Sequence, residues 1–114
     1  KLEFSAGPRL FGLAPDETGL AAWLQLFDPT RMAWMVTLRD GDVTQGLAQA
    51  AVRRGGHVRV GIEDYDGPER PRNEELVRAA AAVGAAHGRR PARPDEVCAL
   101  LDAATPAVSR HAAP

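Results

Sequence analysis

A threefold repetition constrains the fold of this chain more than any other feature of its sequence. The β-like runs "LEFSAG", "MAWMVTL" and "HVRVGI" begin near Leu2, Met32 and His57, and each precedes a turn and then apolar residues at helical spacing. The starts lie 30 residues (2 to 32) and 25 residues (32 to 57) apart, which suits a strand, a loop, a helix and a return. The repetition predicts an α/β fold of parallel strands joined by right-handed crossovers.

The helical patterns have defined starts and stops. Pro15 and the acids after it suit the first turn of one helix, and a second, from about 43 to 53, stops at a pair of glycines. A third runs from about 73 to 86 with Asn73 as its N-cap, and a fourth begins at Pro94. The residues predicted to face the core are Leu20, Trp23, Leu24, Phe27, Leu47, Ala48, Ala51, Val52, Leu76, Val77, Ala80, Val83, Val97, Leu100 and Leu101, with Cys98 as a buried or half-buried hydrophobe.

Three parallel strands alone would leave part of the sheet without a partner. Parallel sheets are covered on both faces or closed into a barrel, whereas three strands leave two unpaired edges and one uncovered face. The 114 residues are one domain's length at most, and they open directly on "KLEF" without an initiator Met. We therefore expect the chain to be a fragment that lacks an N-terminal portion.

Composition narrows the function classes. The net charge of −1, from 14 Lys and Arg against 15 Asp and Glu, comes without a basic stripe, so we expect no nucleic-acid partner. No apolar run approaches the roughly 20 residues that span a bilayer and no signal-peptide pattern is seen, so we expect no membrane partner. A single cysteine cannot form an intrachain disulfide, which favours a reducing, cytoplasmic location.

The third strand carries charged residues on one face. Alternation in "HVRVGIED" puts three apolar residues on one side and His57, Arg59, Gly61 and Glu63 on the other. On an open sheet the polar side would simply meet water. In a barrel of parallel strands it would face the interior, with Glu63 and Asp64 at the mouth where such enzymes keep their active sites. Because neighbouring residues of a strand point in opposite directions, the strand must end or twist near Asp64 for both acids to reach one site.

The run "GGHVRVGIED" resembles the eighth strand of the β-keto acid cleavage enzymes, typified by 3-keto-5-aminohexanoate cleavage enzyme. In that family the signature precedes an Asn-x-x-Leu-Val helix start and a terminal Arg-x-Pro-Ala-x-Pro-x-Glu segment. "NEELV" and "RRPARPDEV" occupy these places here, in the same order. The resemblance is strong over residues 55–101, weaker over "MAWMV" and faint over residues 1–27.

This resemblance implies a (β/α)8 TIM barrel. Residues 1–104 would form its last three βα units and C-terminal helix, and residues 105–114 a disordered tail. The family holds a divalent metal, usually zinc, through two His and one Glu at the barrel mouth, and Glu63 matches that Glu. Asp64 matches the family's catalytic acid-base residue, and Arg59 matches the Arg that pairs with it.

The implied activity is cleavage of a β-keto acid with acetyl-CoA, which yields acetoacetate and a new acyl-CoA. In the family the metal polarises the substrate oxygens, a base removes a proton, and the enolate attacks the thioester before the adduct fragments. Asp64 and Arg59 are the expected base and the cation for the developing oxyanion. The family's barrels usually form homotetramers. With one of three metal ligands, the fragment alone is expected to be inactive.

Some parts of the sequence depart from the family. "YDGPERPR" is a shorter loop than the family's, and "TLRDGDVTQG" replaces a Gly-x-Gly-Arg-x-Gln-like turn, so Arg39 and Gln45 are weak matches. "SAGPR" and "RDGD" are interpreted as ordinary βα turns rather than phosphate cradles. The two His ligands lie on an earlier strand in the family. His57 is therefore expected to be structural, His87 follows a helix and His111 lies in the tail.

Two other interpretations stay open. A degenerate, non-catalytic member would keep Arg59, Glu63 and Asp64 as a salt-bridge cluster and act as a structural or assembly module. A His-x-His on an early strand would favour the enzyme instead. An unrelated sugar-phosphate-type barrel, or a small open α/β module, would be favoured by solvent exposure of Arg59 and Glu63.

Overall fold

The computed structural model describes residues 1–8 and 12–104, so the expected tail lies outside the described residues. Strands and helices alternate along the chain, which confirms the three βα units and the last helix. In order they are β1 (Leu2–Ser5), α1 (Glu17–Leu24), β2 (Met35–Arg39), α2 (Leu47–Arg53), β3 (His57–Val58), α3 (Asn73–Ala86) and α4 (Pro94–Ala104).

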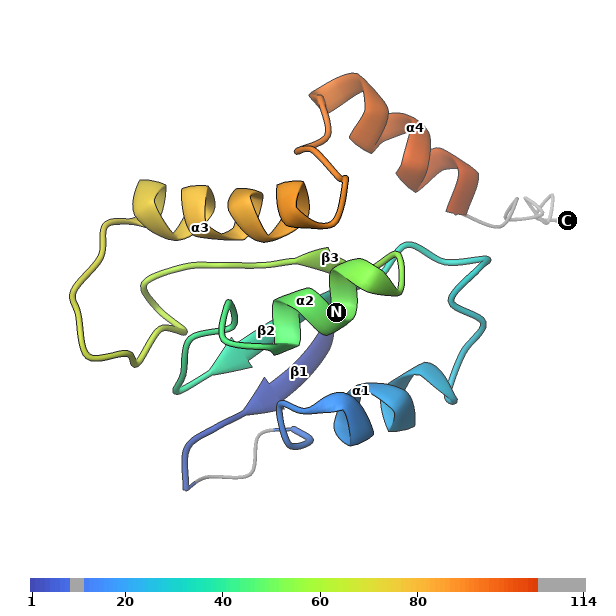
Figure 1. Cartoon of the computed structure of the whole chain (residues 1–114). Coiled ribbons are helices and arrows are strands. Elements are labelled where there is room, and N and C mark those ends of the chain that lie inside the picture. The colour runs from blue at the N-terminus through green and yellow to red at the C-terminus, as the bar shows by residue number, and fades with distance from the viewer. Residues whose placement is uncertain (9–11, 105–114) are drawn as a thin grey trace, which may run out of the picture.

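The strands form one parallel sheet in the order β1-β2-β3 (Figure 1). Val36 in the middle strand pairs with Leu2 on one side and with Val58 on the other. β3 is shorter than "HVRVGI" predicts, although Arg59 N still donates to Val36 O at 2.9 Å. The described residues thus form a small α/β domain of three parallel strands and four helices.

One face of the sheet packs against helices. α2 lies across the sheet in Figure 1, with α1 and α3 on either side of it. The apolar side chains of β1 and β2 meet those of α1, α2 and the turns between them, as the periodicity predicts. This core consists of Leu2, Phe4, Leu20, Trp34, Val36, Leu38, Val43, Leu47, Ala50 and Ala51, with Trp23, Leu24, Phe27, Val58 and Val60 packed against it.

Two helices differ at their N-termini from what the sequence predicts. α2 begins at Leu47 rather than near Val43, because Gly46 lies at φ 107° and interrupts the helical path. The N-cap of α3 is Arg72, and Asn73 is the first helical residue. The prediction of Asn73 as N-cap is therefore wrong, and its side chain accepts instead from Ile62 N at 3.0 Å.

The two glycines before β3 have different structural reasons. Gly55 lies at φ 83°, a left-handed conformation that ends α2 and that side chains rarely adopt. Gly56 is in ordinary backbone, but a Cβ there would come within 2.3 Å of the ring of buried Trp34. Arg89 stabilises the same turn, because its Nη1 donates to Val52 O at 3.1 Å and to Gly56 O at 2.6 Å.

We predict that Gly56→Ala lowers the free energy of unfolding by about 1–3 kcal/mol, because the new methyl group overpacks the site of Trp34. Urea unfolding followed by Trp fluorescence measures the change. Gly61→Ala is the matched control, since a Cβ at Gly61 meets its nearest atom at an ordinary 3.7 Å. Equal stabilities of the two variants would contradict the close approach of Gly56 to the indole ring.

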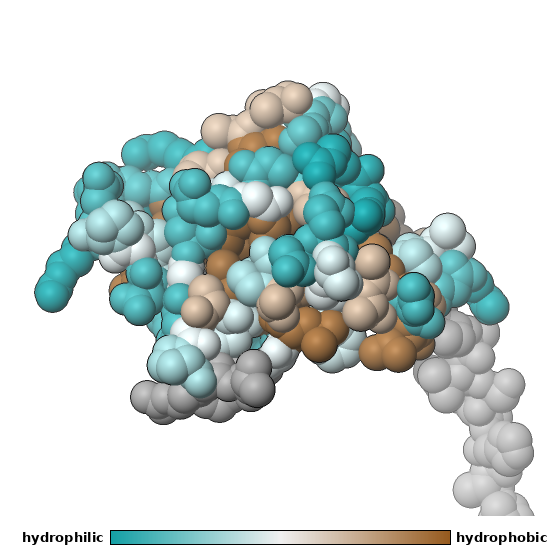
Figure 2. All heavy atoms as spheres, turned by 60° about the horizontal axis from the view of Figure 1, so that its bottom comes forward, coloured by the Kyte–Doolittle hydropathy of each residue, from teal (hydrophilic) through white to brown (hydrophobic). Residues whose placement is uncertain are grey.

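The C-terminal helices are less buried than their periodicity predicts. In α3 Leu76 is buried but Val77 is 57% exposed, because α3 packs mainly against α2 and nothing described covers its far side. The expected packing face of α4 is likewise exposed, and so is Cys98, which corrects its prediction as a buried hydrophobe. Figure 2 shows hydrophobic residues reaching the surface among hydrophilic ones. Within residues 1–8 and 12–104 the exposed large hydrophobics are Leu13, Leu26, Met32, Met35, Ile62, Val77, Val97, Leu100 and Leu101.

Candidate active site

The chain turns sharply where the third strand was expected to continue. Asp64 N donates to Gly61 O at 3.2 Å, and the turn is fixed from outside by the bond from Ile62 N to Asn73. As a result Glu63 and Asp64 do not alternate across a sheet. β3 ends at Val58, earlier than the predicted end near Asp64, and the turn that follows lets both acids reach the same guanidinium.

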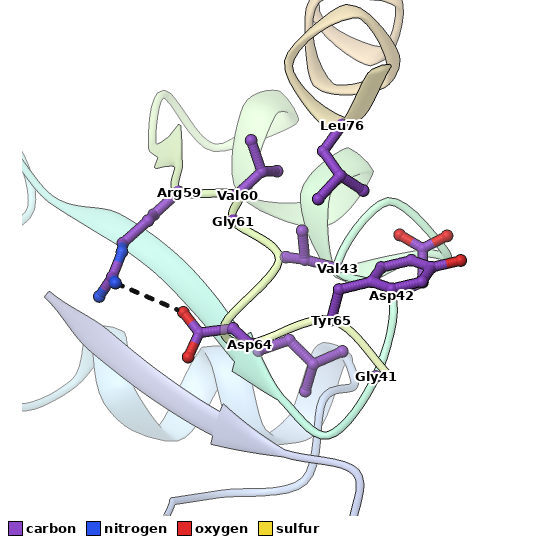
Figure 3. Close-up of a pocket in the computed structure, with 10 residues that line it drawn as sticks. Gly41, Asp42, Val43, Arg59, Val60, Gly61, Asp64, Tyr65 and Leu76 are labelled. Atoms are coloured by element: carbon purple, nitrogen blue, oxygen red, sulfur yellow. Dashed lines mark ion pairs between the residues drawn. The ribbon is translucent and has the colours of Figure 1, made fainter. Parts of the chain in front are cut away.

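Arg59 is the centre of this group of charges. Its Nη2 contacts Glu63 Oε1 and lies 3.6 Å from Asp64 Oδ2. The Asp64 side chain is only 7% exposed, whereas that of Arg59 is 35% and that of Glu63 63% exposed. In Figure 3 Arg59 and Asp64 point toward one another, away from Leu76 on α3. The structure therefore brings the three predicted site residues together.

The neighbouring strand supplies two further contacts to Asp64. Thr37 Oγ1 donates to Asp64 Oδ2 at 3.1 Å, and Arg39 Nη1 lies 3.9 Å from Asp64 Oδ1. Sequence reasoning left Thr37 unremarked and treated Arg39 only as a weak family match. The signal was nevertheless present, because alternation in "MVTLR" puts Thr37 and Arg39 on the face opposite Val36 and Leu38.

Charged residues of β1, of β2 and of the segment after β3 meet on this face. The pKa of Glu3 in β1 is lowered first by its hydrogen bond to Lys1, and further by the positive charges of Arg39 and Arg59, against the opposing effect of burial. Glu3 is the register partner of Thr37. The face opposite the helices therefore carries alternating positive and negative groups around one buried carboxylate.

The hollow beside Asp64 is small. It is lined by residues of β2, of the turn after it and of α3, and includes Arg59, Asp64, Tyr65 and Leu76 (Figure 3). Its volume is about 10 Å³, no more than the room that one water molecule needs. Ligand pockets usually measure about 300–1,000 Å³, so the described residues form one wall of a site rather than an enclosed pocket.

The sequence as a whole matches one family model. Residues 2–102 match the model described as beta-keto acid cleavage enzyme. The chain belongs to the β-keto acid cleavage enzyme family. The match includes residues 2–27, a region whose own residues give only a faint resemblance. A comparison with curated proteins gives no significant match.

Family membership decides whether the exposure of Arg59 and Glu63 indicates an unrelated protein. Arg59 and Glu63 are partly exposed, which alone would favour an unrelated open α/β module. The match over nearly the whole described chain shows instead a member of an enzyme family.

A metal site of the kind that the resemblance implies would need several ligands close to Glu63. Glu63 is an accessible carboxylate, but it pairs with Arg59. Within 1–8 and 12–104 there is no group of three His, Cys, Asp or Glu side chains that could hold a metal ion. Of the three histidines, His87 follows α3 and His111 lies outside the described residues, which leaves His57. The described residues therefore do not by themselves fit a zinc ion.

His57 lies at the opposite end of β3 from the acids. Burial lowers the pKa of its imidazole below the usual value, and the nearby charge of Arg89 lowers it further. His57 N donates to Trp34 O at 2.9 Å, so its backbone belongs to the sheet ladder. These features agree with the structural role expected for His57.

We predict that His57 makes the stability of the fold depend on pH in the mildly acidic range. Its folded pKa is below the unfolded value near 6.5, so the unfolded chain binds the proton more readily. This contribution is full above pH 6.5 and is lost as the pH falls from there toward the folded pKa. Urea unfolding of wild type and His57→Gln between pH 5 and 8 measures it; equal losses on acidification in both proteins would contradict it.

Proposed function

We propose that this chain contributes the acid-base wall of an active site that cleaves a β-keto acid with acetyl-CoA, giving acetoacetate and a new acyl-CoA. The observation that carries the proposal is the approach of Arg59 to Asp64 at 3.6 Å, beside the exposed carboxylate of Glu63, in a chain of this family. Family membership supports the reaction class, and the charge arrangement supports the roles that the resemblance implies for Asp64 and Arg59.

Asp64 is the proposed base. It removes a proton from the carbon between the two carbonyl groups of the β-keto acid, and the enolate then attacks the thioester carbonyl. Arg59 holds the Asp64 carboxylate and offers guanidinium N–H groups to the oxygen that gains negative charge. In the adduct the CoA sulfur leaves the acetyl carbon and bonds to the original keto carbon. The bond from that carbon to the α-carbon then breaks, and the α-carbon takes its proton back from Asp64, which releases acetoacetate and the new acyl-CoA.

We further propose that the three strands belong to a (β/α)8 barrel. The face opposite the helices is polar, and many large hydrophobics are exposed. Among the described residues, the outer edge of β1 has only a single bridge, between Phe4 and Leu13, and the outer edge of β3 has no strand partner. Additional parallel strands would pair these edges and turn Arg59, Thr37 and Asp64 toward the barrel interior. The carboxylates would then lie at the mouth.

Glu63 is proposed as the single zinc ligand from this chain, with the remaining ligands supplied from outside the described residues. Zinc would supply Lewis-acid polarisation of the substrate oxygens. An acyl-CoA is the proposed co-substrate, with no CoA-contacting residue assigned. A homotetramer and a cytoplasmic location complete the proposal.

The test compares this chain with one extended by the upstream coding sequence. Zinc content by elemental analysis and acetoacetate formation from β-keto acids and acetyl-CoA are measured for both. We expect stoichiometric zinc and turnover for the extended chain and neither for the 114 residues. Turnover by the short chain would overturn the need for outside ligands, and a folded, zinc-loaded extended chain without turnover would favour the degenerate, non-catalytic alternative.

A further inference from the structure

Asp64 is attached to a turn rather than to a paired strand. Its N–H donates to Gly61 O, and it lies six residues beyond the end of β3 at Val58. A side chain on such a turn is not directed by a ladder of hydrogen bonds on both sides. Its orientation must be fixed through contacts of the carboxylate itself.

The nearest of these contacts comes from Thr37. Thr37 Oγ1 lies 3.1 Å from Asp64 Oδ2, whereas Arg59 lies 3.6 Å from the same oxygen and Arg39 lies 3.9 Å from Oδ1. Thr37 is 1% exposed and stands in the central strand, with neighbours paired on either side. As a β-branched residue it has little freedom about χ1, so its hydroxyl is a rigid donor.

The arginines are less rigid partners. Arg59 divides its guanidinium between Glu63 and Asp64, and Arg39 is 44% exposed on a long side chain. Both supply charge, and both have several rotatable bonds over which to move. The short, buried hydroxyl of Thr37 is the contact that can define the direction of the carboxylate.

We propose that Thr37 is a positioning residue for the reaction. Its hydroxyl holds Oδ2 of Asp64 beside Arg59, which leaves Oδ1 as the oxygen that takes the proton from the substrate carbon. This inference rests on the proposed function for its catalytic meaning, while the contact itself is testable without turnover.

The first measurement is made on the 114-residue chain in solution. The three-bond couplings of the Asp64 β-protons report whether its χ1 angle occupies one rotamer or several. We expect one rotamer in the wild type and in Thr37→Ser, and averaged couplings in Thr37→Val, which has nearly the same shape but no hydroxyl. Unchanged couplings in Thr37→Val would overturn the inference.

The second measurement is the kinetics of acetoacetate formation by the form of the protein that turns over. We expect Thr37→Val to lower kcat about 10- to 100-fold with KM changed less than about twofold, because a displaced base reacts poorly with a normally bound substrate. Thr37→Ser should restore kcat to within about threefold of wild type. Failure of the serine variant to restore it would contradict a role for the hydroxyl.

Thr30→Val is the matched control. It also removes a hydroxyl-to-carboxylate bond, from Thr30 Oγ1 to Asp28 Oδ1 at 2.6 Å, in an exposed turn away from the site. We expect wild-type couplings and kcat. Full turnover by Asp64→Asn would contradict the proposed function. If Thr37→Val still gave averaged couplings, the contact between Thr37 and Asp64 would stand, so failure of the proposed function can be distinguished from failure of this inference.

Discussion

Replacement of Asp64 by asparagine is expected to lower kcat for acetoacetate formation by about 10²–10⁴-fold, the usual contribution of a general base. The amide has the shape of the carboxylate, and its oxygen can still accept from Thr37, which lies 3.1 Å from Asp64 Oδ2 in the wild type. It cannot take a proton from carbon. KM should change little, because the substrate contacts of Arg59 remain.

Asp66→Asn is the matched control for that experiment. Asp66 lies two residues away and is exposed, and its N–H donates to Gly41 O at 3.4 Å, a backbone contact that the substitution preserves. We expect wild-type kcat for this variant. Equal activities of Asp64→Asn and wild type would show that the base is another residue and that Asp64 serves only as the partner of the arginines.

Replacement of Arg59 by methionine is expected to lower kcat/KM by about 10²–10³-fold, the cost of removing one donor to a developing oxyanion. Methionine keeps most of the length of the side chain and removes its charge. The substitution also leaves the Glu63 and Asp64 carboxylates without the guanidinium that contacts both. Steady-state kinetics, with circular dichroism to confirm folding, measures the effect.

Two further variants separate charge from geometry. Arg59→Lys retains the charge but not the forked donor set, so we expect activity between those of wild type and Arg59→Met. Arg54→Met removes a guanidinium whose Nη2 lies 2.7 Å from Glu17 Oε2, away from the site, and should leave kcat/KM unchanged. If Arg59→Lys were as inactive as Arg59→Met, the planar fork rather than the charge would be the requirement; full activity of Arg59→Met would refute the proposed role.

The order of the elements followed from the sequence because periodicity and turn residues are local signals. β1 lies within "LEFSAG", β2 begins inside "MAWMVTL" and runs one residue past it to Arg39, and Pro94 begins α4 as expected. The burial of α3 and α4 could not be read in the same way. Val77 and Cys98 have the spacing of core residues, but burial depends on whether another element lies opposite them, which periodicity does not report.

The sequence predicted the residues of the candidate site but not the residues that hold them in place. Arg59, Glu63 and Asp64 came from the signature, and their mutual approach required only that the strand end where it does. Thr37 binds Asp64 from a position 27 residues earlier in the chain. Asn73 binds the backbone of Ile62 from a position 11 residues later. Such contacts depend on strand register and on the path of a loop, neither of which a single sequence specifies.

The openness of the polar face has an electrostatic consequence. In bulk water two unit charges 4 Å apart attract by about 1 kcal/mol, and at the effective dielectric constant near a protein surface by about 4 kcal/mol. Arg59 and Glu63 now meet partly in water, so dissolved salt screens them. Enclosure by further strands would lower the local dielectric constant, and the same side chains, without moving, would hold a developing negative charge far more strongly. The catalytic strength proposed for this group of residues would therefore depend on how well water is excluded from the face on which they lie.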